Sequence, residues 1–169
     1  KVIAHAAAEG LKKVSLELGG KSPNIIMPDA DLEAAIPASA MGIFFNSGQT
    51  CTAPSRLYVH EDVRDEVIKG IAEFGKSMKV APGLDEESQI GPLVSQKQFE
   101  RVSDYIEIGQ KEGAEIASGG KRVGNSGFFL EPTVITNTRN DMRIVREEIF
   151  GPVLVTQSFS DADEVIALA

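Results

Sequence analysis

The chain has 169 residues, of which 42% are hydrophobic and 25% charged, and its formal net charge is −8. This size supports one domain with its own core, and the acidic balance argues against nucleic acid or an anionic membrane as the main partner. No apolar run approaches the roughly 18 residues of a membrane span. The one cysteine excludes an internal disulfide and is typical of a reducing, cytoplasmic compartment. The two histidines lie far apart, so the sequence shows no metal-ligand spacing.

The first third of the chain alternates helix and strand signals. The alanine-rich stretch from Val2 to Ala8 is typical of a helix, with Gly10 as its stop. We predict a strand over Val14 to Leu18 and a short buried strand over Asn24 to Met27.

Asp31 is a predicted N-cap of an amphipathic helix. Pro37 lies inside this pattern and is expected to kink the helix or to delay its start. The predicted inward face consists of Leu32, Ala35, Ile36, Ala40, Ile43 and Phe44.

The remaining elements alternate in the same way, which predicts the α/β class. Strands are expected over Arg56 to His60, Phe129 to Ile135 and Val153 to Phe159. Helices are expected from about Val63 to Met78, from Ser95 to Gly113 and from Asp161 onward. Loops are expected over residues 82–92 and 117–127.

A loop of small polar residues surrounds the single thiol, Cys51. It runs from Asn46 to Ala53, after an apolar helix and before a strand. An isolated cysteine is often an inert core residue, but such a cysteine is expected inside an apolar run. A nucleophile needs one exposed side and backbone N–H groups that can stabilise an oxyanion. Neither histidine is an evident partner for the thiol, so a carboxylate acting through water is the better candidate activator.

Glu17 lies between two leucines and precedes Gly19-Gly20. It is either a solvent-facing acid of an alternating strand or a carboxylate in a partly apolar slot that takes a proton from water. The two glycines allow a sharp turn or a close approach of the backbone to a ligand.

Three short motifs in this chain resemble motifs of one known protein family. Residues 16–23 (LELGGKSP) and 45–51 (FNSGQTC) resemble the glutamate and cysteine signatures of the NAD(P)-dependent aldehyde dehydrogenase superfamily, with Glu17 34 positions before Cys51. Residues 147–152 (EEIFGP) resemble a third family motif. Three motifs in family order are far more specific than one.

The resemblance implies a covalent mechanism. Cys51 would attack the aldehyde, hydride would pass to NAD or NADP, and Glu17 would activate the water that hydrolyses the thioester. Glu148 would hold the nicotinamide ribose, with Phe150 and the backbone of Leu18 beside the nicotinamide. Gln98 resembles a position near the cofactor ribose. Without the resemblance, the favoured interpretation of Glu147 and Glu148 is solvated acids, and that of Phe150 is a core residue.

The resemblance also implies an architecture. It is an aldehyde-dehydrogenase-type catalytic domain with an open twisted sheet flanked by helices, truncated at both ends. Residues 1–16 would be the tail of the coenzyme-binding domain and residues 17–169 an incomplete catalytic domain. The chain is thus expected to be an internal fragment, inactive alone, of an enzyme that is a homo-oligomer, acts on a small aldehyde and binds neither nucleic acid nor membrane.

Two alternatives stay open. One is a relative that transfers the acyl group to coenzyme A or phosphate; Glu17 argues against it, because acylating relatives often lack this base. The other is a non-catalytic folding or interaction unit, against which the presence of both Cys51 and Glu17 argues.

Overall fold

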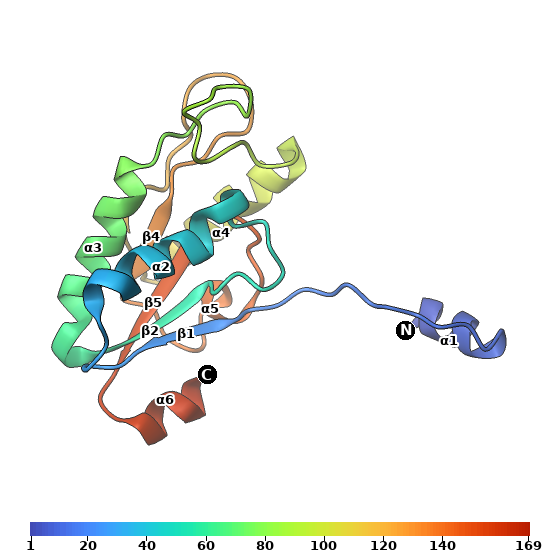
Figure 1. The fold of residues 1–169 in the computed structure, drawn as a ribbon, viewed down its shortest axis with the longest axis horizontal. Coiled ribbons are helices and arrows are strands. Elements are labelled where there is room, and N and C mark those ends of the chain that lie inside the picture. The colour runs from blue at the N-terminus through green and yellow to red at the C-terminus, as the bar shows by residue number, and fades with distance from the viewer.

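The computed structural model describes all 169 residues and contains one five-stranded sheet in the order β1-β2-β5-β4-β3. The first four strands in this order run parallel, and β3 pairs antiparallel with β4 at one edge. The strands are β1 (Pro23–Ile26), β2 (Arg56–His60), β3 (Glu115–Ser118), β4 (Thr133–Thr136) and β5 (Val153–Phe159). Figure 1 shows the helices arranged around this sheet.

Six α-helices and two 3₁₀ turns connect the strands. They are α1 (Val2–Glu9), α2 (Leu32–Phe44), η1 (Phe45–Gly48), η2 (Glu61–Val63), α3 (Arg64–Ser77), α4 (Gln96–Lys111), α5 (Arg143–Arg146) and α6 (Ala162–Leu168). No helix combines the length and the apolar character that a membrane crossing requires.

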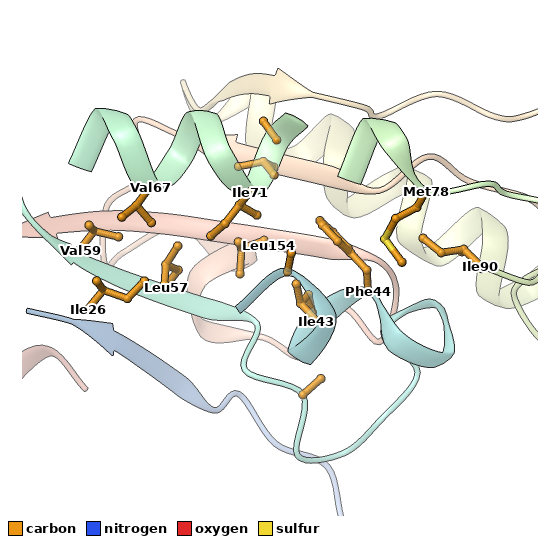
Figure 2. Close-up of a cluster of buried hydrophobic side chains, with 14 residues drawn as sticks. Ile26, Ile43, Phe44, Leu57, Val59, Val67, Ile71, Met78, Ile90 and Leu154 are labelled. Carbon is orange, nitrogen blue, oxygen red and sulfur yellow. The ribbon is translucent and has the colours of Figure 1, made fainter. Parts of the chain in front are cut away.

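The sheet is buried on both faces, as expected for parallel strands covered by helices. Along β5, Leu154 joins a cluster with residues of α2 and α3, whereas Val153 and Val155 join a second cluster with residues of α4 and α5. Successive side chains of a strand point to opposite faces, so each cluster covers one face. Figure 2 shows the first cluster, in which Phe44 and Ile71 meet Leu154. The predicted α/β class is confirmed.

Side-chain caps fix where three of the helices begin. Asp31 accepts hydrogen bonds from the amides of Glu33 and Ala34, and Ser95 and Asp161 cap α4 and α6 in the same manner. The predicted Asp31 cap is therefore confirmed, and Ser95 and Asp161 cap the helices that were expected to start there. Because α2 begins at Leu32, Pro37 does not delay its start.

The predicted strand over residues 14–18 is wrong. These residues form no regular element, and Leu18 is 70% exposed. Residues 1–18 form an extended arm that leaves the sheet and carries α1 at its far end (Figure 1). A strand needs a neighbour for its backbone groups, and no other segment of this chain runs beside the arm.

Three smaller differences concern the second half of the chain. The predicted loop over residues 117–127 contains the end of β3, and the single helical turn α5 was not predicted. The predicted strand from Phe129 is shorter, since β4 begins at Thr133. Pro132 has no N–H to donate to a ladder, and before it only Leu130 pairs, in an isolated bridge with Arg122.

Candidate active site

A cleft of about 520 Å³ gathers side chains from four separate parts of the chain. All six site residues predicted from the sequence line it, namely Glu17, Leu18, Cys51, Gln98, Glu148 and Phe150. Three further residues line the cleft: Gly19, which the sequence analysis noted for a sharp turn or a close approach to a ligand, and Lys97 and Arg101, which it missed. Arg101 follows Gln98 by three positions on the same helix, and this spacing was the available signal.

The loop before Cys51 has an unusual backbone. Asn46, Ser47 and Gly48 have φ values of 51°, 56° and 68°, so three successive residues lie in the left-handed region. Asparagine tolerates this region better than most residues and glycine adopts it freely, whereas Ser47 is strained there. Such a conformation persists only where the surroundings hold it in place.

Hydrogen bonds to a neighbouring segment hold this loop. The buried Ser47 donates its hydroxyl to the carbonyl of Gly91 at 2.8 Å, and the amide of Val94 donates to Oε1 of Gln49 at 2.9 Å. Gly48 lies so close to the carbonyl of Gly151 that a Cβ would overlap it. The loop therefore presents Cys51, which is free and half-buried, from a fixed backbone.

Gly19 and Gly20 bring the glutamate segment against the other two parts of the cleft. A Cβ on Gly19 would overlap the carboxylate of Glu148, and one on Gly20 would overlap the carbonyl of Cys51. The amide of Gly20 donates to Oε1 of Glu148 at 3.1 Å. Gly20 is thus required for a close approach to the backbone of Cys51, another part of the chain, whereas the sequence analysis expected the two glycines to allow a sharp turn or a close approach to a ligand.

The segment that carries Glu148 is also tightly held. Phe150 has φ of 62°, a strained value for a non-glycine residue. Nε2 of Gln98 donates to the carbonyls of Ile149 and Phe150 at 3.1 and 2.8 Å, and Arg101 donates to the carbonyl of Glu148 at 2.7 Å. Gln98 therefore contacts the backbone of this segment as well as lining the cleft.

Glu17 differs in one respect from the expected picture. Its side chain is exposed, so the residues of this chain do not form the partly apolar slot that was considered for it. Leu18 beside it is also exposed, at 70%. Both lie on the segment between α1 and β1, and a slot there would need contacts beyond those that this chain makes.

Comparison with known proteins decides the family. The model of the aldehyde dehydrogenase family matches residues 1–169. The chain belongs to the aldehyde dehydrogenase family.

Relatives of this aldehyde dehydrogenase chain agree over its whole length. It is 50% identical over 169 residues to the mitochondrial aldehyde dehydrogenase of Leishmania tarentolae and covers 34% of that protein. It is 48% identical to the putative aldehyde dehydrogenase DhaS of Bacillus subtilis, again covering 34%. An NAD+ complex of the Bacillus cereus aldehyde dehydrogenase superposes with a TM-score of 0.94 at 49% identity, over 99% of this chain and 34% of that one. The chain thus spans about a third of these relatives.

Two ionisable groups near Glu148 have pKa values far from their ordinary ones, namely Lys21 and Glu147. Burial, reinforced by the positive charge of Arg56, lowers the pKa of Lys21 to about 7, although Glu148 acts in the opposite direction. The Lys21 amine is buried without a hydrogen-bond partner. Hydrogen bonds from Arg143 and then Tyr105 lower the pKa of Glu147 to about 2, so this carboxylate is ionised at neutral pH.

Proposed function

We propose that this chain carries the reacting residues of an enzyme that oxidises an aldehyde to a carboxylic acid and transfers hydride to NAD(P)+. One observation carries the proposal: a single cleft gathers Cys51, Glu17, Glu148 and Phe150 from segments far apart in the sequence. The NAD+ complex of the Bacillus cereus relative supports the choice of cofactor.

Cys51 is proposed as the nucleophile. Its thiolate attacks the carbonyl carbon, the C=O π electrons move to oxygen, and protonation gives a thiohemiacetal. Backbone N–H groups beside the nucleophile can stabilise the developing oxyanion, and the rigid loop fixes the direction of the Cys51 N–H. Hydride then leaves the former carbonyl carbon, the hydroxyl proton is released to solvent as the C=O bond re-forms, and a thioester on sulfur remains. NAD(P)+, when bound, supplies the hydride acceptor.

Glu17 is proposed as the general base of the second half-reaction. Its carboxylate removes a proton from a water molecule, whose oxygen forms a bond to the thioester carbon. The C–S bond breaks, and the Cys51 thiolate leaves with the electron pair. The products are the carboxylic acid and the regenerated nucleophile.

The cleft suits the nicotinamide end of a dinucleotide. Within the chain, only Oε1 of Glu148 is engaged by a hydrogen bond, so Oε2 remains available to accept from ribose hydroxyls. Phe150 offers an aromatic face, and the backbone of Leu18 offers a polar edge. Gln98 is the fourth residue proposed for this region, although its amide already serves two carbonyls.

We further infer that residues 1–16 belong to a coenzyme-binding domain and residues 17–169 to a catalytic domain, in an enzyme that forms a homo-oligomer. The exposure of α1, which has no buried residue, supports this division. The exposed Glu17 and the relatives' greater length support the view that the 169 residues alone do not turn over aldehyde. NADH formation by the isolated chain would contradict that view.

The test is a chimera in which these 169 residues replace the matched third of the Bacillus cereus enzyme. Formation of NADH from NAD+ and a small aldehyde is followed by absorbance. We expect Cys51→Ser to abolish the reaction. Glu17→Gln is expected to retain a rapid first turnover and to lower the steady-state rate about 100-fold or more, because only thioester hydrolysis needs the base. Activity that survives Cys51→Ser would overturn the proposal.

A further inference from the structure

One face of α4 holds the whole segment that carries Glu148. Gln98, Arg101 and Tyr105 recur at spacings of three and four, which places them on one side of the helix. We call these three residues the α4 stripe. Gln98 binds the carbonyls of residues 149 and 150, and Arg101 binds that of residue 148. Two side chains therefore hold three consecutive backbone carbonyls.

Tyr105 also binds Glu147, the residue before this segment of three carbonyls. Its hydroxyl donates to Oε2 of Glu147 at 2.7 Å, and Arg143 donates to both oxygens of the same carboxylate at 3.2 and 3.0 Å. Arg101 donates to the Tyr105 hydroxyl at 3.3 Å. The guanidinium carbons of Arg101 and Arg143 lie 5.0 and 5.6 Å from the centroid of the Tyr105 ring. Tyr105 is thus the centre of the network, and its ring is buried.

The position of Glu148 is coupled to the rest of the cleft. Its carboxylate accepts a hydrogen bond from the Gly20 amide, and Gly20 in turn lies against the carbonyl of Cys51. Phe150 occupies a left-handed conformation that costs about 1 kcal/mol or more and needs external support. A displacement of residues 147–150 therefore moves the Glu148 carboxylate relative to Gly20 and, through Gly20, relative to the nucleophile.

We propose that Tyr105 and Arg101 are positioning residues: through Glu147 and the Glu148 carbonyl, they set where the Glu148 carboxylate lies in the cleft. The consequence for cofactor affinity rests on the proposed function, in which Glu148 holds the ribose. The effect on the position of the Glu148 carboxylate does not rest on the proposed function, because the hydrogen bond from the Gly20 amide to that carboxylate can be measured directly.

The first experiment uses the 169-residue chain and measures hydrogen exchange of the Gly20 amide by NMR. Tyr105→Phe keeps the buried ring and removes only the hydroxyl, and Arg101→Met keeps most of the stem. Each is expected to speed Gly20 exchange roughly fivefold or more, the size expected from weakening a hydrogen bond to a charged group. The control is Glu107→Gln on the same helix, whose side chain pairs only with Lys111; it should leave Gly20 exchange unchanged.

Hydrogen exchange of amides in the sheet distinguishes a positioning role from a general loss of stability. Exchange of the Val59 and Val155 amides is expected to match wild type in both variants. Gly20 exchange that stays at the wild-type rate in Tyr105→Phe and Arg101→Met would overturn the proposal. So would a uniform acceleration across the sheet, because it would show a purely structural role.

The second experiment measures the catalytic consequence in the Bacillus cereus chimera. Tyr105→Phe is expected to raise KM for NAD+ about tenfold while kcat changes less than about threefold, the pattern of weakened ground-state binding. An unchanged KM would overturn the link to the cofactor. If the parental chimera makes no NADH, the proposed function fails, and Gly20 exchange still decides whether Tyr105 and Arg101 position Glu148.

Discussion

At the scale of single residues, Lys21 is the least expected feature. Its amine is buried without a hydrogen-bond partner and interacts electrostatically with Glu148. Nε of Arg56 donates to the Lys21 carbonyl at 2.8 Å, which brings a second positive charge close. Desolvation and that charge both disfavour the protonated amine. The sequence analysis included Lys21 only as a member of the motif at residues 16–23, because no sequence pattern predicts that a lysine side chain will be buried.

The lowered pKa of Lys21 predicts how the stability of the chain depends on pH. The folded-state pKa is lowered from 10.5 to about 7, so between these values the unfolded chain binds more protons than the folded one. Stability from this group therefore rises with pH across that window and is lowest below pH 7. Lys21→Met should be more stable than wild type by about 3 kcal/mol at pH 6, and the difference should shrink towards pH 10.

Urea unfolding followed by circular dichroism at pH 6, 8 and 10 measures this difference. Lys69→Met, on the exposed side of α3, corrects for the loss of one positive charge. A stability difference between wild type and Lys21→Met that stays constant over this range would show that burial does not displace the lysine titration.

The chemistry-bearing residues were accessible from the sequence because each lies in a short motif. Cys51, Glu17 and Glu148 line the predicted site together, although their catalytic roles stay proposals. Tyr105 was not identified, because its significance depends on Glu147, 42 positions later. A contact of that range has no local signature, whereas a motif does.

At the scale of elements, the cysteine loop depends on its close contact with the segment after Phe150. Gly48 has φ of 68°, and a Cβ there would overlap the Gly151 carbonyl. Both the conformation and the space therefore require glycine. The buried Ser47, bonded to Gly91, fixes the loop from its other side.

Gly48→Ala is expected to destabilise the chain by about 2 kcal/mol or more, because it adds backbone strain and a backbone clash. It should also change the rate at which iodoacetamide alkylates Cys51, the only thiol. Thermal unfolding and mass spectrometry of the alkylated chain measure the two effects. Gly83→Ala is the matched control, since a Cβ at Gly83 meets nothing within 4 Å and the loop there is exposed. Equal stability of the two variants would contradict the steric argument.

Element boundaries show what sequence periodicity can and cannot give. Strands β2 and β5 were predicted with their observed bounds, because each lies at the centre of the sheet and contains a run of three apolar residues, Leu57–Val59 and Val153–Val155. Edge strand β3 was not predicted, since its pattern is weak and a glycine pair follows it. The strand expected over residues 14–18 was wrong, because alternation signals a half-buried strand only where a partner exists.

At the scale of the whole molecule, the layered body and the arm behave differently. The body buries both sheet faces in two apolar clusters. The arm exposes Leu11, Val14, Leu16 and Leu18, with exposed fractions of 94%, 46%, 50% and 70%. The α/β class followed from the alternation of strands and helices, and the resemblance implied a sheet flanked by helices. The separation of the arm did not, because it depends on which segments are present to pack against it.

The exposed arm predicts association between copies of this chain. Exposed apolar side chains such as these four lower the free energy when they are buried against another surface, by about 25 cal/mol per Å². We expect light scattering to show a mass that rises with concentration. Leu11→Ser combined with Leu16→Ser should reduce this rise, whereas Leu84→Ser, which removes a 99% exposed leucine from a loop outside the arm, should not. A monomer at every concentration, or equal effects of the two sets of changes, would show that the arm does not drive association.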